Sequence, residues 1–270
     1  NANAFNEAPA LAKLVKAGQL PPVDQRLPKE PPVIKPVDQV GAYGGLWRRA
    51  YTGLSDLVGV RRVLYEPLVR WSPDYQIVPN LARKWEVDET GRIFTFYLIE
   101  GVKWSDGAPF TADDVMFYFE DIVLDKELTS TPPNWLSVDG NAPKASKIDD
   151  YTFRIEFEKP YSLFIDQLAC PHGMELVTKP KHYLKQFHKK YADPKKLEEL
   201  MNAKNASTWV KLFLDASNLR HSLFVSNQMP SLCAWITKVP APAKRFVMER
   251  NPYYWKVDTN GNQLPYIDSM

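Results

Sequence analysis

The sequence predicts an α/β protein, and three segments indicate this. Residues 151–158 alternate apolar and polar side chains, the period-two pattern of a strand with one face in water. Residues 93–99 are almost wholly apolar or aromatic, as expected for a strand covered on both faces. Residues 112–124 carry an apolar stripe at helical spacing, made by Val115, Tyr118, Phe119 and Ile122.

The elements before these segments begin with an arm. Residues 8–17 fit a short helix that Gly18 would end, and prolines are dense between positions 21 and 36. Since proline favours extended backbone, we expect residues 1–40 to form a proline-rich N-terminal arm. A glycine-rich break follows, and residues 46–51 predict the first true strand.

The remaining elements are shorter. Strands are predicted at residues 76–78, 85–87 and 245–249, and helices at 181–191 and from Pro194 to about residue 214. Residues 264–267 resemble the start of a strand, so we expect the chain to be a fragment of a longer protein.

Composition limits the classes of function. The 270 residues are 44% hydrophobic and 24% charged, ordinary values for a soluble globular protein. The net charge is +2 and no basic block stands out, so nothing indicates a nucleic-acid partner. No apolar run could cross a bilayer and no signal peptide is visible, which fits a cytosolic protein or a secreted one without its signal. Cys170 and Cys233 could pair or remain free.

The acidic residues of the densest motif have structural explanations. In residues 94–115, Asp106 and Gly107 form a tight turn, and Thr111 is a good N-cap with Asp114 in capping-box position. Asp113 and Asp114 also lie at the positive end of the helix dipole. These roles account for Asp106, Asp113 and Asp114, so we expect these residues to form neither a catalytic nor a metal-binding acid cluster.

As a whole string, this motif resembles the signature of family 5 bacterial solute-binding proteins, which include oligopeptide-, dipeptide- and nickel-binding proteins. The matching blocks are YEPLVR (65–70), PNLARKWEV (79–87), FTFYLIEGVKWSDGAPFTADDV (94–115), DDYTFRIEF (149–157), RNPYYW (250–255) and LPYID (264–268). The chain departs from the family at residues 230–236, where a Gly-Pro-Tyr turn is usual, and at residues 99–100.

The resemblance implies a fold and a role. The fold would be a type II periplasmic-binding-protein fold, of which this chain supplies lobe one with an inserted β-rich subdomain, and the second lobe is missing. Residues 41–60 and 160–270 would form the discontinuous core of lobe one, and residues 61–159 the insertion. The role would be solute capture, outside the cytoplasmic membrane, by the binding component of an ABC importer. We expect a monomer that binds a peptide or similar small solute and delivers it to a membrane permease.

Loops at the ends of lobe-one strands would line the ligand cleft. The residues expected to contact ligand are Tyr51, Thr52, Asp56, Asn134, Trp135 and His172. Aromatic and small polar side chains suit a ligand held through hydrogen bonds. Each also has a structural interpretation, since Trp135 follows two prolines and a lone histidine is more often a surface residue than a metal ligand.

Two alternatives remain open at this point. An oligosaccharide is the first, because the same fold serves sugars and the chain is rich in aromatic residues. A secreted hydrolase of peptides or glycans is the second, but the sequence contains no GxSxG, HExxH or P-loop motif. We therefore expect a binding protein and not an enzyme, without metal or cofactor.

Overall fold

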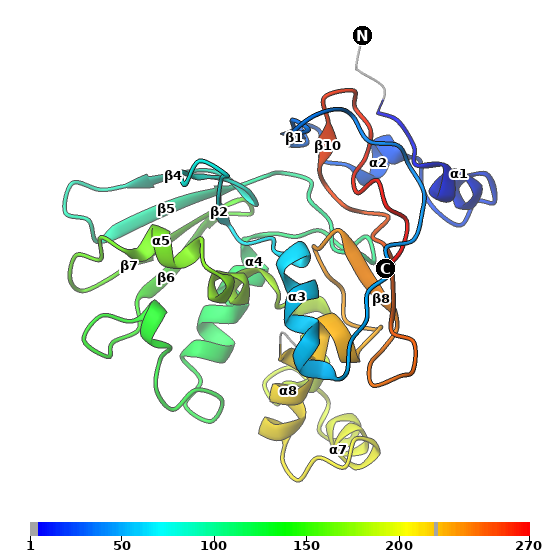
Figure 1. Ribbon diagram of the computed structural model, residues 1–270. Helices are drawn as coiled ribbons and strands as arrows, with labels where there is room; N and C mark the ends of the chain where they lie inside the picture. The colour runs from blue at the N-terminus through cyan, green and yellow to red at the C-terminus, as the bar shows by residue number, and fades with distance from the viewer. Residues whose placement is uncertain (1–4, 219–220) are drawn as a thin grey trace. The chain divides into compact units, whose positions relative to one another are not determined.

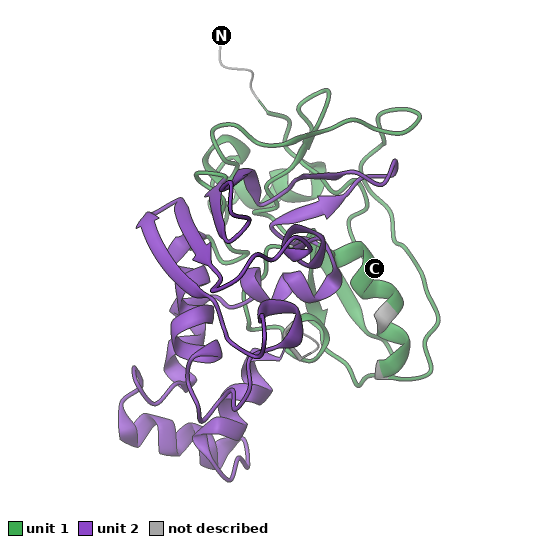
Figure 2. Ribbon diagram, turned by 90° about the vertical axis from the view of Figure 1, so that its left-hand side faces the viewer, with its two compact units in different colours: residues 1–65, 99–109, 222–270 green, residues 66–98, 110–221 purple. Residues whose placement is uncertain are grey.

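The computed structural model describes residues 5–218 and 221–270. The chain divides into two compact units (Figure 2). Unit 1 comprises residues 1–65, 99–109 and 222–270, and unit 2 comprises residues 66–98 and 110–221. The expected division had placed residues 160–221 in the core of lobe one, whereas their contacts lie within unit 2 together with the strands of the expected insertion. The assignment of lobes and subdomain itself stays a prediction.

Unit 1 is built from short elements (Figure 1). Its helical segments are α1 (Pro9–Lys16), α2 (Val23–Arg26), η1 (Leu54–Leu57), α3 (Val58–Arg61) and η2 (Arg62–Leu64), and η7 (His221–Val225) begins at its boundary. Its strands are β1 (Val33–Ile34), β8 (Trp235–Val239), β9 (Val247–Arg250) and β10 (Val257–Asp258). β1 pairs in parallel with β10, and β8 pairs antiparallel with β9.

Unit 2 holds the larger sheet. Its strands are β2 (Val69–Trp71), β3 (Ile77–Pro79), β4 (Ala82–Val87), β5 (Ile93–Leu98), β6 (Lys144–Asp149) and β7 (Thr152–Glu156). Its helical segments are α4 (Ala112–Tyr118), η3 (Phe119–Val123), η4 (Asn134–Leu136), α5 (Phe164–Leu168), η5 (Pro171–Val177), α6 (Lys181–Leu184), η6 (Lys185–Phe187), α7 (Pro194–Ala203) and α8 (Trp209–Ser217). An antiparallel sheet has the order β4-β5-β7-β6, and β2 pairs with β3.

The core of unit 2 is aromatic. In the register of β5 and β7, Phe96 lies opposite Phe153, and the two rings stack at 5.2 Å. Phe164 of α5 covers the same face, with its ring 4.9 Å from Phe94 and 4.8 Å from Phe157, and Figure 1 shows α5 across the sheet. The other face of β5 is only half-buried, so the expectation that residues 93–99 are covered on both faces was wrong.

One sequence prediction for unit 2 is confirmed and another is corrected. Thr111 accepts a hydrogen bond from Asp113 N, and the Asp114 carboxylate accepts one from Thr111 N, so the predicted capping box is present. The helix then continues as a π-helical turn, η3, up to Val123. The predicted helix at residues 194–214 is two helices, because the chain turns at Asn205 with a positive φ of 51°.

The proline-rich arm packs on the C-terminal part of unit 1. Asn6 N donates to Gly261 O at 2.9 Å, and Val33 of β1 pairs with Val257 of β10. Val23 and Leu27 form a small buried cluster with Val257. The arm is therefore held by backbone pairing and by apolar contacts with residues more than 200 positions away.

The prediction of a strand at residues 46–51 was wrong. Only Leu46 forms a bridge, in parallel with Ser269, and Trp47 N donates to Ser269 O at 2.9 Å. Residues 48–50 are exposed and pair with no strand among the described residues. Local β propensity was present, but a strand also requires a partner along its length.

The turn at Gly107 gives a first testable prediction. Both Gly107 and Gly45 have a φ of +90°, where an alanine is strained by about 1–2 kcal/mol. A Cβ on Gly107 would also lie 3.0 Å from the ring of Tyr253, whereas nothing lies within 4 Å of one on Gly45. We expect Gly107→Ala to destabilise the protein by roughly 2–3 kcal/mol, and the matched control Gly45→Ala by only the strain. Thermal unfolding of both variants checks this. Equal losses of stability in the two variants would show that the Tyr253 side chain moves away from the new Cβ at no cost.

Candidate functional site

Unit 1 contains a pocket of about 270 Å³ that we call the basic pocket. It is lined by Trp47, Arg49, Ala50, Tyr51, Asp56, Leu57, Val60, Lys244, Arg245, Phe246 and Met270. Two of the expected ligand contacts, Tyr51 and Asp56, are among these residues. Its volume is near the lower end of the range found for small-molecule sites.

Tyr51 joins the two chain segments that form the basic pocket. Its hydroxyl donates a hydrogen bond to Ala243 O, and its ring meets the Phe246 ring edge-on at 6.5 Å. Phe246 in turn contacts Phe224, with ring centroids 6.0 Å apart. These contacts fix the loop that carries Lys244 and Arg245 beside the segment of residues 47–60.

Thr52 does not line the pocket but orients the carboxylate that does. The backbone N–H and the hydroxyl of Thr52 donate to Asp56 Oδ2 at 2.6 and 2.7 Å. These hydrogen bonds, the backbone one foremost, hold the pKa of Asp56 below its ordinary value. Asp56 is therefore a carboxylate at neutral pH and already accepts two hydrogen bonds.

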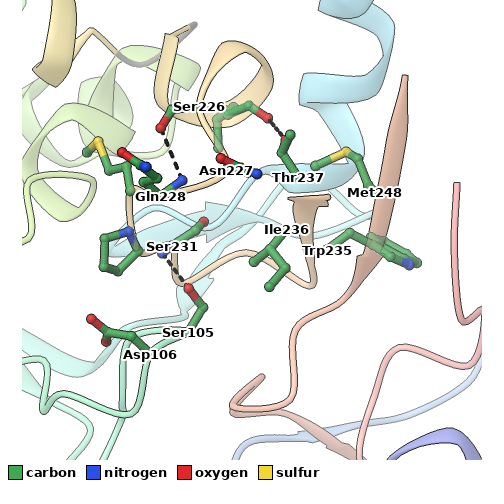
Figure 3. A pocket seen from close by; sticks show the side chains of 13 residues that line it. Ser105, Asp106, Ser226, Asn227, Gln228, Ser231, Trp235, Ile236, Thr237 and Met248 are labelled. Carbon is green, nitrogen blue, oxygen red and sulfur yellow. Dashed lines mark hydrogen bonds between the residues drawn. The ribbon is translucent and has the colours of Figure 1, made fainter. Parts of the chain in front are cut away.

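A second pocket of unit 1, of about 180 Å³, is lined by amide and hydroxyl side chains and by about as many apolar ones, and we call it the amide pocket (Figure 3). Its lining is Ser105, Asp106, Leu223, Ser226, Asn227, Gln228, Met229, Pro230, Ser231, Trp235, Ile236, Thr237 and Met248. Ser105 Oγ accepts from Ser231 N at 3.0 Å, and Thr237 Oγ1 donates to Leu223 O at 2.6 Å. The segment of residues 230–236, where the sequence departs from the family pattern, thus forms one wall of this pocket.

The other three expected contact residues belong to unit 2. Asn134 and Trp135 begin η4, and His172 lies in η5. The rings of Trp135 and His172 approach to 5.1 Å, and Tyr161 OH donates to Trp135 O at 3.2 Å. Burial lowers the pKa of His172, and its Nε2 is buried without a hydrogen-bond partner among the described residues. This imidazole is neutral at neutral pH.

The structure therefore brings the six predicted residues together as two groups, one in each unit. Sequence reasoning missed most of the basic pocket, above all Trp47, Arg49, Lys244 and Arg245. The signal available was weak, because two pairs of adjacent basic residues, 48–49 and 244–245, are about 200 positions apart. The amide pocket was also missed, since serine, asparagine and glutamine are ordinary loop residues.

The cysteine, histidine and acidic side chains of the described part of the chain form neither a cluster of metal ligands nor a disulfide. No group of three or more His, Cys, Asp or Glu residues there could hold a metal ion. Cys170 and Cys233 form no disulfide, and the Cys233 thiol donates to Leu64 O at 3.0 Å. Across residues 5–218 and 221–270, every helix is too short or too polar to span a membrane.

Comparison with known proteins identifies the family. Residues 76–270 match the family model described as bacterial extracellular solute-binding proteins, family 5 Middle. The chain belongs to the family 5 bacterial extracellular solute-binding proteins. The resemblance found in the sequence blocks is thus confirmed over most of the chain.

Two curated relatives of this family 5 protein differ in the ligand they are named for. A periplasmic alpha-galactoside-binding protein of Rhizobium meliloti (strain 1021) is 37% identical over 96% of this chain and 37% of its own length. The periplasmic oligopeptide-binding protein OppA of Salmonella typhimurium (strain LT2) is 26% identical over 77% of this chain and 34% of its own length. The chain thus spans little more than a third of the length of these two relatives.

Two solved structures also differ in this way, since one is named for oligopeptide binding and the other contains a sugar. A structure titled oligopeptide-binding protein OppA is 42% identical, with a TM-score of 0.90 over 100% of this chain and 41% of that one. The periplasmic binding protein MelB of Agrobacterium fabrum C58, in complex with stachyose, is 33% identical, with a TM-score of 0.67 over 96% of this chain and 39% of that one. The periplasmic-binding-protein fold, with mixed α/β content, is therefore shown for this family 5 member.

Proposed function

We propose that this chain forms part of the substrate-binding component of an ABC importer. It captures a peptide or similar small solute outside the cytoplasmic membrane, as a monomer, and delivers it to a membrane permease. Family membership and the names of the relatives, most of them periplasmic, support this proposal. The finer architecture is proposed with it: residues 41–60 and 160–270 are the core of lobe one, residues 61–159 the insertion, and a second lobe completes the cleft.

The observation that carries this proposal is the basic pocket. Tyr51 and Asp56, chosen from the sequence as ligand contacts, both line a pocket that also presents the aromatic rings of Trp47 and Phe246. Aromatic walls with a few fixed polar groups are typical of small-molecule sites. Thr52, Asn134, Trp135 and His172 are proposed as further contacts. Within the pocket, the Asp56 carboxylate already accepts two hydrogen bonds from Thr52. It is therefore suited to orienting a ligand and less suited to proton transfer.

The test is binding without turnover. The full-length protein, purified from its host's extracytoplasmic fraction, is analysed by native mass spectrometry for a retained solute, and calorimetry then measures the affinity of that solute. We expect a one-to-one complex, unchanged solute after prolonged incubation, and loss of solute uptake by a strain that lacks the gene. Product formed in excess of protein would contradict the proposal, as would unchanged uptake.

An oligosaccharide is the second candidate ligand. The amide pocket favours it, because serine hydroxyls and the amides of Asn227 and Gln228 suit a neutral, hydroxyl-rich molecule. The alpha-galactoside-binding relative and the stachyose complex of MelB point in the same direction. Calorimetry with stachyose separates the candidates, since a peptide-specific protein should show no heat of binding with this neutral sugar.

A further inference from the structure

The basic pocket carries more positive than negative charge. Three of its lining residues, Arg49, Lys244 and Arg245, are basic, and Asp56 is its one acidic side chain. All three basic side chains are exposed, and among the described residues none lies within ion-pair distance of a carboxylate. A pocket in which Asp56 is the only counter-charge presents two uncompensated positive charges to a ligand.

Asp56 is a poor neutraliser of these cations. Its Oδ2 accepts two hydrogen bonds from Thr52, which turn the carboxylate toward its own loop. Elsewhere in the chain, exposed lysines do find carboxylates, for example Lys211 with Asp215 at 2.9 Å and Lys238 with Glu249 at 2.6 Å. Exposed basic side chains without an ion pair among the described residues also occur elsewhere, for example Lys13 and Lys16, so what distinguishes the basic pocket is that three such cations line one cavity with a single acidic side chain.

Uncharged neighbours position the Arg49 guanidinium and the backbone of the loop that carries Lys244 and Arg245. The Arg49 guanidinium lies 5.6 Å from the centroid of the Trp47 ring, at cation–π distance. It also rests against Gly59, where a Cβ would lie 3.2 Å from Arg49 Nη2. Lys244 and Arg245 lie between Ala243 and Phe246, both of which contact Tyr51. A guanidinium held in this way is preorganised to bind a planar anion through two parallel hydrogen bonds.

We propose that the basic pocket binds a carboxylate group of the transported solute. The inference rests on the proposed function and deepens it, because it selects among the possible solutes. A peptide offers this group at its C-terminus and an acidic sugar offers it on a uronate ring, whereas stachyose has none. The carboxylate docks against Arg49 and Arg245, with Lys244 adding a third positive charge, and the apolar part of the solute contacts Trp47 and Phe246.

The experiment compares matched probes on the full-length protein by calorimetry. The probes are trialanine, trialanine amide, trigalacturonate, the methyl ester of trigalacturonate and stachyose. We expect one acid to bind, and the loss of its carboxylate, by amidation or by esterification, to weaken binding about ten- to hundredfold. Trialanine as the binding acid identifies a peptide source of the carboxylate, and trigalacturonate a sugar acid. Affinity for the acid should also fall as the salt concentration rises, because exposed charges are screened.

Variants locate the effect. We expect Arg49→Met and Arg245→Met each to weaken binding of the acid about tenfold or more, with no change in binding of its amide or ester. The matched control is Arg48→Met, the exposed neighbour of Arg49, which does not line the pocket and should leave binding unchanged. Two variants at separate positions guard against a folding defect in either.

The outcomes distinguish this inference from the proposed function. If stachyose binds tightly and neither Arg49→Met nor Arg245→Met alters its affinity, solute capture stands and the carboxylate inference is overturned. Equal affinity for trialanine and its amide overturns it as well. If no probe binds and no solute is retained by the purified protein, the proposed function fails and the inference fails with it.

Discussion

Replacing Arg26 with methionine is expected to lower the free energy of unfolding by about 3–5 kcal/mol, the cost typical of breaking a buried charged network by removing one partner. The Arg26 side chain is fully buried at 0% exposure. It donates to Pro21 O at 2.9 Å and to Gln263 Oε1 at 3.0 Å, and it also binds Pro252 O and the Glu7 carboxylate. Methionine fills a similar volume but removes this donor from all four acceptors, and Pro252 O keeps a second donor in Gln263 Nε2.

The same variant should release the N-terminal arm. Arg26 connects the arm to the segment of residues 252–263, so its loss should let trypsin cleave after Lys29 earlier than in the wild type. Arg62→Met is the matched control, because Arg62 is an exposed arginine of unit 1 and should change stability by less than about 0.5 kcal/mol. Denaturant unfolding and timed proteolysis measure both effects. Similar losses in the two variants would show that Arg26 is not the anchor of the arm.

Replacing Phe164 with alanine should also cost about 3–5 kcal/mol, because it empties the centre of the aromatic core of unit 2. Phe164 is 0% exposed, and its ring lies within 6.4 Å of the rings of Phe94, Phe96, Phe157 and Tyr161. Removing the ring would leave four neighbouring aromatic rings without this contact, and rigid rings can move only a little to fill the cavity. Denaturant unfolding measures the loss directly.

The adjacent residue supplies the control for this prediction. Leu163 is 57% exposed, and Leu163→Ala should change the free energy of unfolding by no more than about 0.5 kcal/mol. The loss at Phe164 should also loosen the site in unit 2, since Tyr161, which contacts Phe164, donates to Trp135 O. A cost below about 1 kcal/mol for Phe164→Ala would mean that the sheet and α5 collapse together over the cavity.

Much of the local structure could be predicted because it depends on neighbouring residues. The α1 helix was expected at residues 8–17 and is found at Pro9–Lys16. The strand with period-two alternation is β7, and Thr111 and Asp114 form the expected capping box. In each case the signal lies within one element, where spacing alone fixes which side chains share a face.

The misses are elements whose stability comes from distant partners. β6 has exposed or half-exposed side chains along its length, so it shows no apolar pattern, yet it pairs with β7 over its whole length. β1 lies in the proline-rich arm and is a strand because β10 pairs with it. Residues 46–51 show the opposite case, since the local pattern predicts a strand and the fold supplies only Ser269 as a partner.

The sequence by itself determined the family, the mixed α/β content and the capped helix. It also predicted six ligand contacts, of which Tyr51 and Asp56 line the basic pocket and Thr52 orients Asp56. Only the tertiary structure decided that Tyr51 reaches Ala243, 192 positions away, and so places Lys244 and Arg245 beside Arg49. The physical reason is that spacing along a chain sets the faces of single helices and strands, whereas a pocket forms from side chains that meet only after folding. The proposed preference for a carboxylate follows from the gathering of Arg49, Lys244 and Arg245 in one pocket, which no local sequence pattern predicts.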